Sequence, residues 1–152
     1  MQEIFKPVIL LAAWTMVMWA WMYATRLPAM NRSGIMESMV IGTNGQNLRN
    51  DLVANGEERA SWVSDNYNHL HEQPTVFYAV AIILAMLQAG EGINAYIAWA
   101  YVALRVAHSI AQVTINHVLS RFALFSLSTL CLIALIVHAF AMVFNVHLPF
   151  MK

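Results

Sequence analysis

The sequence is poor in charge and in cysteine. Only 11% of its 152 residues are charged, and eight Lys plus Arg balance eight Asp plus Glu, so the formal net charge is zero. A chain without a basic surplus lacks the electrostatic footprint that binding to DNA or RNA requires. The single cysteine excludes a disulfide framework and a CxxC metal site. Nucleic acid is therefore excluded as a partner, and so is the class of small disulfide-rich domains.

Apolar residues are in excess, since 60% of the chain is hydrophobic. A soluble domain of similar length still exposes about 30% of its unfolded surface, so it cannot hide such an excess. Four apolar segments are each close to the roughly 20 residues that a helix needs to cross a bilayer. These segments span about 7–25, 70–89, 93–115 and 122–146. The sequence predicts an all-α integral membrane protein, with a single domain over residues 1–152 and four transmembrane helices.

The distribution of positive charge predicts the orientation in the membrane. The polar connection 26–69 holds four arginines, and the connection between the third and fourth spans holds Arg121. The opposite side holds only Lys6 and Lys152. Because cytoplasmic connections carry the excess of Lys and Arg, we expect residues 26–69 in the cytoplasm and both termini outside it.

The polar connection has its own local signals. Residues 30–51 are rich in Gly, Asn and Ser, which predicts a loop. Asn55 is a candidate N-cap with Glu58 three residues later, as in a capping box. No helix breaker follows until Pro74, so the pattern predicts one long helix that enters the membrane and kinks near this proline.

The third apolar segment carries a polar stripe along one helical face. Its members are Asn94, Tyr101, Arg105, His108, Ser109, Gln112 and Asn116. Arg105 lies about 16 Å along the helix from Asn116, and a charge at this depth costs at least about 2.5 kcal/mol. We therefore expect Arg105 to face protein or a water-filled cavity. Two compatible hypotheses stay open, because Arg105 could lock helices together through a carboxylate or bind an anionic ligand.

A second polar cluster lies at the start of the second apolar segment. Asp65, Asn68, His69 and Glu72 are spaced at i, i+3, i+4 and i+7, which places them on one helical face. If the second and third spans are antiparallel, Glu72 lies at a similar depth in the membrane to Gln112 and Asn116, at the cytoplasmic end of the stripe. The simplest geometry is a polar chamber between the second and third spans, open to the cytoplasm and suited to a small zwitterionic ligand. For Asp65 alone, a solvated helix entry is the simpler interpretation.

The histidines argue against haem and against a metal. His108 and His138 would lie at about 12 Å and about 25 Å from the cytoplasmic edge, too different in depth to ligate one haem. His69 and His71 are two residues apart and point to different helical faces, so they are poor partners for a metal ion.

Two stretches resemble a known family. The segment NHLHEQPTVFYAVA (Asn68–Ala81) resembles the opening of helix two in bacterial members of the MAPEG family, the membrane-associated proteins in eicosanoid and glutathione metabolism. The segment AWAYVALRVAHSIAQVTINHVLSRF (Ala98–Phe122) resembles helix three of that family. Arg105-x-x-His108-Ser109 and the later Arg121-Phe122 carry most of the second resemblance.

The resemblance implies a left-handed bundle of four transmembrane helices that assembles as a homotrimer, here in a bacterial inner membrane with periplasmic termini. Its active site would lie between subunits, open to the cytoplasm, and hold glutathione as co-substrate. By position, Arg121 matches the catalytic arginine that stabilises the glutathione thiolate. The matching contacts to glutathione would come from Arg105, His108, Gln112, Asn116, Glu72, Asn68 and His69. The implied activity is glutathione transfer to a lipophilic small molecule, or peroxide reduction.

Departures from the family pattern keep a second hypothesis open. The family commonly has Asn three residues before the glutamate, where this chain has His69, and it often has arginines just upstream, where this chain has Asp65 and Asn66. The tyrosines that follow the helix-three arginine in the eicosanoid-making branch are absent after Tyr101. The alternative function is a non-catalytic structural or accessory subunit of a larger membrane complex, or a protein that binds membrane lipid.

Overall fold

The computed structural model describes residues 2–38 and 44–146, and every regular element among them is a helix. The predicted outer lysine Lys152 and the middle of the predicted 30–51 loop lie outside these residues. In chain order the helices are α1 (Phe5–Arg32), α2 (Ile35–Ser38), α3 (Gly45–Ala54), α4 (Glu58–His69), α5 (Gln73–Met86), α6 (Ile93–Thr114) and α7 (Val118–Val143).

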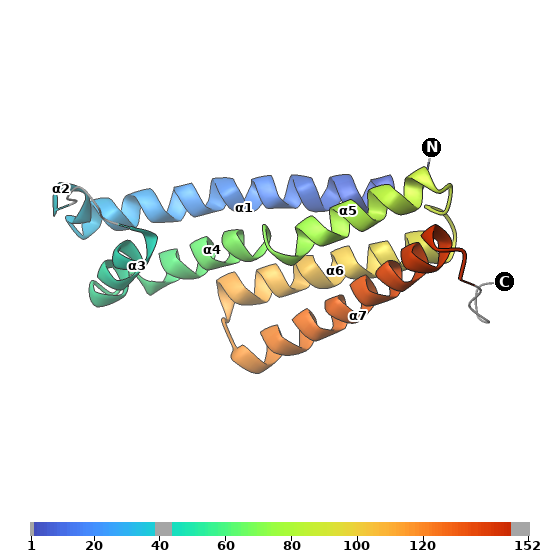
Figure 1. Cartoon of the computed structure of the whole chain (residues 1–152). Helices are drawn as coiled ribbons and strands as arrows, with labels where there is room; N and C mark the ends of the chain where they lie inside the picture. Colours follow the sequence, from blue (N-terminus) through green and yellow to red (C-terminus); the bar gives the residue numbers. More distant parts are fainter. Residues whose placement is uncertain (1, 39–43, 147–152) are drawn as a thin grey trace.

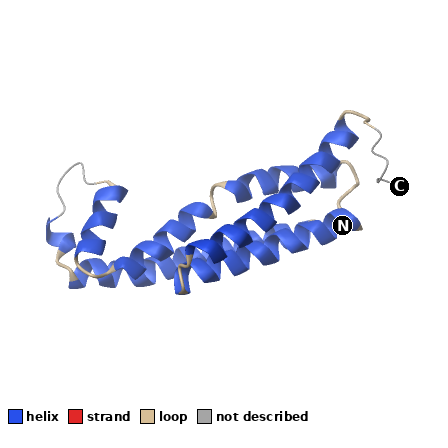
Figure 2. Ribbon diagram, turned by 90° about the horizontal axis from the view of Figure 1, so that it is seen from below, coloured by secondary structure: helices blue, strands red, loops and turns tan. Residues whose placement is uncertain are grey.

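The long helices lie side by side along one axis (Figures 1 and 2). α4 and α5 follow each other along α1, whereas α6 and α7 form an antiparallel pair with the most extensive contact between any two helices. The short helices α2 and α3 gather beyond the turn that joins α6 to α7 (Figure 1). The start of α1, the α5–α6 turn and the end of α7 lie together at the opposite end.

Two helices, α1 and α7, are long and apolar enough to cross a membrane. Both expose large apolar side chains over most of their length, including Trp19 and Trp21 on α1 and Phe140 on α7. α1 has 28 residues and is therefore about 42 Å long, more than the roughly 30 Å of hydrocarbon in a bilayer. α1 is therefore long enough for its last turns, which include Arg26, to extend beyond the hydrocarbon.

The main core fills the space between α1, α5, α6 and α7. At its centre the ring of Phe77 on α5 stacks on Tyr101 of α6, with centroids 4.4 Å apart and planes 22° apart. Both side chains are fully buried, as are Leu84 and Leu135. A second, smaller apolar cluster fixes α3 against the end of α1 and the start of α4. It consists of Ala29, Met30, Ile35, Leu48, Leu52 and Ala60.

The loop predicted over 30–51 is wrong where the structure describes it. α1 continues to Arg32, and α3 begins at Gly45. The side chain of Asn44 caps α3 by accepting hydrogen bonds from the backbone N–H groups of the second and third residues that follow it. Leu48 and Leu52, four residues apart, bury one face of α3. The glycine and asparagine content predicted a loop, but residues 45–54 form a capped amphipathic helix.

The capping box predicted at Asn55 is also wrong. Asn55 ends α3, and its backbone N–H donates to the carbonyl oxygen of Asp51. Gly56 follows with a φ of +76°, the left-handed conformation that commonly terminates a helix. α4 then begins at Glu58 with no side-chain cap. The Asn-Gly pair is thus a stop signal, although the spacing to Glu58 resembles a start.

A full break replaces the kink predicted near Pro74. α4 ends at His69, residues 70–72 form a turn, and α5 begins at Gln73. Pro74 lies in the first turn of α5, where its missing N–H has no partner to lose. The break therefore leaves His69 at the end of α4 and Glu72 in the turn before α5.

Candidate functional site

The polar stripe of α6 faces the protein interior, as its spacing predicts. Six of its members are buried, namely Asn94, Tyr101, Arg105, His108, Ser109 and Gln112. Arg105 is 2% exposed, which confirms the expected burial of this charge. Asn116 follows the helix with a φ of +49°, and this left-handed residue helps to turn the chain toward α7.

Aromatic groups, rather than a carboxylate, surround Arg105. Its Nε donates to the hydroxyl oxygen of Tyr101 at 3.3 Å, and its guanidinium carbon lies 5.2 Å from the ring centroid of Phe125. Its Nη2 is buried without a hydrogen-bond partner. No ion pair of Arg105 occurs in the described part of the chain, so the expected helix-locking pair with a carboxylate is not formed there. The carboxylate of Glu72 instead lies 2.8 Å from Nδ1 of His69, and its side chain is 63% exposed.

A hydrogen bond between two buried side chains joins α4 to α6. Asn66 Nδ2 donates to Ser109 Oγ at 2.7 Å, and the two residues are 1% and 0% exposed. The bond lies beside His69, one turn along α4, and beside His108, the preceding residue of α6. Sequence reasoning did not assign a role to Asn66. The available signal was its phase, because Asn66 is in helical register with the buried residues Val63 and Leu70.

Three of the predicted site residues meet at one pocket. His69 from α4, His108 from α6 and Arg121 from α7 line a cavity of about 300 Å³, which we call the arginine pocket. The rings of His69 and His108 meet edge to face, with centroids 6.3 Å apart. The remaining wall is apolar and comes from Val118, Phe122 and Phe125. The pocket therefore presents cationic or titratable nitrogen groups beside a hydrophobic surface.

Arg121 is held in place by the turn that precedes α7. Its Nη1 donates to Asn116 Oδ1 at 2.7 Å, while its Nε is buried without a partner. Asn116 thus orients the guanidinium without neutralising its charge. The predicted stripe member Asn116 acts on the pocket through Arg121 and does not line the cavity itself.

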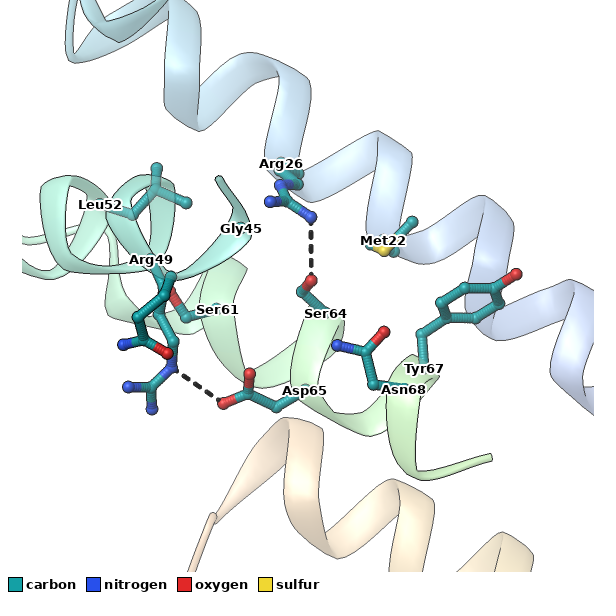
Figure 3. A pocket seen from close by; sticks show the side chains of 11 residues that line it. Met22, Arg26, Gly45, Arg49, Leu52, Ser61, Ser64, Asp65, Tyr67 and Asn68 are labelled. Atoms are coloured by element: carbon teal, nitrogen blue, oxygen red, sulfur yellow. Dashed lines mark hydrogen bonds and ion pairs between the residues drawn. The ribbon is translucent and has the colours of Figure 1, made fainter. Parts of the chain in front are cut away.

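The second predicted cluster is divided, because only His69 of its four members lines the arginine pocket. Asp65 and Asn68 line a separate cavity of about 460 Å³ between α1, α3 and α4, which we call the α3 pocket (Figure 3). Glu72 lines neither cavity, and Gln112 is buried with its Oε1 unpartnered. In the described chain, the polar residues predicted to line a single chamber between the second and third spans therefore divide between two pockets.

Among the described residues, no three His, Cys, Asp or Glu side chains are grouped so that they could hold a metal ion. His138 of α7 contacts the start of α6 instead, with its Nδ1 2.5 Å from Asn94 Oδ1.

The sequence model of the MAPEG family matches residues 4–141. The chain belongs to the MAPEG family. Comparisons with curated proteins and with solved structures gave no match. Membership and the two apolar helices make this an integral membrane protein. Both pockets of this MAPEG protein lie within the matched residues.

Proposed function

We propose that this MAPEG protein is a glutathione-dependent transferase or peroxidase that acts on a lipophilic electrophile. The observation that carries the proposal is the meeting of His69, His108 and Arg121 with an apolar wall in the arginine pocket. Glutathione needs polar and cationic groups, whereas a membrane-dissolved electrophile needs an apolar surface. The arginine pocket offers both within one cavity.

Arg121 would stabilise the reactive form of glutathione. A thiol becomes a strong nucleophile only as its thiolate, and a neighbouring guanidinium favours that anion. Arg121 lines the pocket, and its buried Nε has no protein acceptor, so the protein does not offset the charge that a bound thiolate would meet. The two histidines could accept hydrogen bonds from, or donate them to, the glutathione peptide.

The apolar residues Val118, Phe122 and Phe125 would hold the electrophile beside the thiolate. In transfer, a carbon–sulfur bond forms while the bond to the leaving group breaks, and that group departs with the electron pair. In peroxide reduction, the thiolate forms a sulfur–oxygen bond with one peroxide oxygen while the oxygen–oxygen bond breaks, and the departing alkoxide takes up a proton to give the alcohol. A second glutathione then reduces the resulting sulfenic acid, giving glutathione disulfide and water.

The membrane setting is part of the proposal. We infer a bundle of four transmembrane helices that assembles as a homotrimer, with the glutathione site between subunits and open to the cytoplasm. The arginines of the 26–69 connection support this orientation in a bacterial inner membrane. A neighbouring subunit would then supply the glutathione contacts that a single chain does not gather around Arg121.

Calorimetry with glutathione on the purified full-length protein tests the proposal. We expect saturable heat of binding in the wild-type protein. The affinity for glutathione should weaken at least about tenfold in Arg121→Gln, because a hydrogen bond to a charged group contributes about 1.5–3 kcal/mol. Arg59→Gln is the matched control, since Arg59 is exposed on α4 and lines neither of the two pockets. No heat at millimolar glutathione would refute the proposal and favour the accessory-subunit or lipid-binding hypothesis.

A further inference from the structure

The α3 pocket carries an excess of positive charge. Arg26 from α1 and Arg49 from α3 line it together with one carboxylate, Asp65 of α4 (Figure 3). Arg49 Nε lies 3.2 Å from Asp65 Oδ2, so these two charges offset each other. Arg26 Nη1 donates to the neutral Ser64 Oγ at 3.0 Å. The half-buried charge of Arg26 is therefore not balanced by a carboxylate in the pocket.

Two further groups in the α3 pocket suit an anionic ligand, namely a buried hydroxyl and a helix N-terminus. Ser61 is 2% exposed, and its Oγ has no hydrogen-bond partner. A buried hydroxyl without a partner is costly, which makes a bound ligand or water the natural partner. Gly45 and Gln46 bring the N-terminus of α3 to the pocket wall. Asn44 Oδ1 already accepts from the N–H groups of Gln46 and Asn47, so this end of α3 attracts anions chiefly through the positive end of the helix dipole.

The position of the α3 pocket fits the level of lipid headgroups. Arg26 is the first charged residue after the predicted apolar span of α1, and Met22, one turn earlier, forms part of the pocket wall. The α3 pocket and the arginine pocket share no lining residue. A ligand in the α3 pocket would therefore occupy a site separate from the proposed thiol chemistry.

We propose that the α3 pocket binds the phosphate group of a phosphate ester, held by Arg26, the Ser61 hydroxyl and the N-terminus of α3. A guanidinium beside a helix N-terminus supplies the charge and the donors that phosphate oxygens need. Such a phosphate could belong to a membrane phospholipid or to a soluble metabolite. The inference does not depend on the proposed glutathione activity.

Two probes distinguish the sources of the phosphate. The full-length protein in nanodiscs of phosphatidylcholine is titrated with sn-glycerol 3-phosphate, and the protein in detergent is titrated with dihexanoyl phosphatidic acid, each by calorimetry. Saturable binding of the lipid probe alone assigns the site to a headgroup, and binding of the glycerol phosphate alone assigns it to a soluble ester. Saturable binding of both shows that phosphate itself is recognised, whereas binding of neither overturns the proposal.

Charge variants test whether the α3 pocket is the binding site. We expect Arg26→Gln to weaken the affinity at least about tenfold and Ser61→Ala to weaken it about threefold or more. Asp65→Asn removes the one carboxylate that lines the pocket among the described residues, and it should tighten binding, a gain that loss of structure cannot mimic. Arg59→Gln, on the same helix, should leave the affinity unchanged. Equal losses in all four variants, or displacement of the phosphate probe by glutathione, would overturn the assignment.

Discussion

The buried hydrogen bond between Asn66 and Ser109 offers a quantitative test of how α4 is fixed to α6. Ser109→Ala leaves the Asn66 amide buried at 1% exposure, with Nδ2 newly unpaired beside an Oδ1 that already lacks a partner. Asn66→Ala leaves the fully buried Ser109 hydroxyl without its donor. An unmade buried bond costs about 1–3 kcal/mol in soluble proteins, whereas interhelical bonds in membrane proteins average about 0.6 kcal/mol with a maximum of about 1.7 kcal/mol.

We therefore expect each single variant to lose about 1–2 kcal/mol of unfolding free energy. The double variant should lose less than the sum, with a coupling energy of about 0.5–1.5 kcal/mol, because it strands neither partner. The assay is equilibrium unfolding by dodecyl sulfate in mixed micelles, followed by tryptophan fluorescence. Additive losses would refute the hydrogen bond as a source of stability. Because Asn66 and Ser109 flank His69 and His108, the single variants should also weaken glutathione binding.

Further predictions concern a tight turn, an exposed ion pair and the turn before α7. Gly90→Ala should cost about 1–3 kcal/mol in the same unfolding assay, because a Cβ there would lie 2.6 Å from the buried Ile4 Cγ2; an unchanged midpoint would contradict this contact. The hydrogen bonds from Arg32 hold the pKa of the Glu57 carboxyl below its usual value. Their contribution to stability should be present above the unfolded pKa and disappear as the pH falls through the folded pKa, and Glu57→Gln should flatten this part of the pH–stability curve. Asn116→Gly relieves a φ of +49° but removes the hydrogen bond to Arg121. The unfolding free energy should therefore stay unchanged while the absorbance of bound glutathione thiolate falls. A parallel loss of stability and of thiolate absorbance would show a purely structural role.

The sequence was sufficient to predict the helical class, the family and the inward-facing stripe. The helical class follows from composition, and the inward-facing stripe follows from helical periodicity, since a mid-span charge such as Arg105 must be buried against protein. The family followed from the resemblance of the segments Asn68–Ala81 and Ala98–Phe122. The boundaries of α6 at Ile93 and Thr114 agree closely with the predicted segment 93–115. Four membrane spans and the trimer stay predictions, because their tests lie in a bilayer and in the assembled protein.

The division of the site into two pockets could not be predicted from spacing alone. Asn68 and His69 are neighbours in sequence, but α1 and α3 enclose a cavity beside Asn68, whereas α6 and α7 enclose one beside His69. The capped helix α3 also depends on tertiary contacts, namely the burial of Leu48 and Leu52. A single polar face was therefore a reasonable prediction for an unbroken helix but not for a helix with a turn at residues 70–72.

The central claim is that Arg121 stabilises glutathione as its thiolate in the arginine pocket. The most direct measurement is the ultraviolet thiolate absorbance of glutathione bound to the full-length protein at neutral pH, compared with Arg121→Gln at a saturating concentration of glutathione. We predict a thiolate band in the wild-type protein that is largely lost in Arg121→Gln and retained in Arg59→Gln. A band of equal size in Arg121→Gln, or no band in the wild-type protein at saturation, would contradict the account.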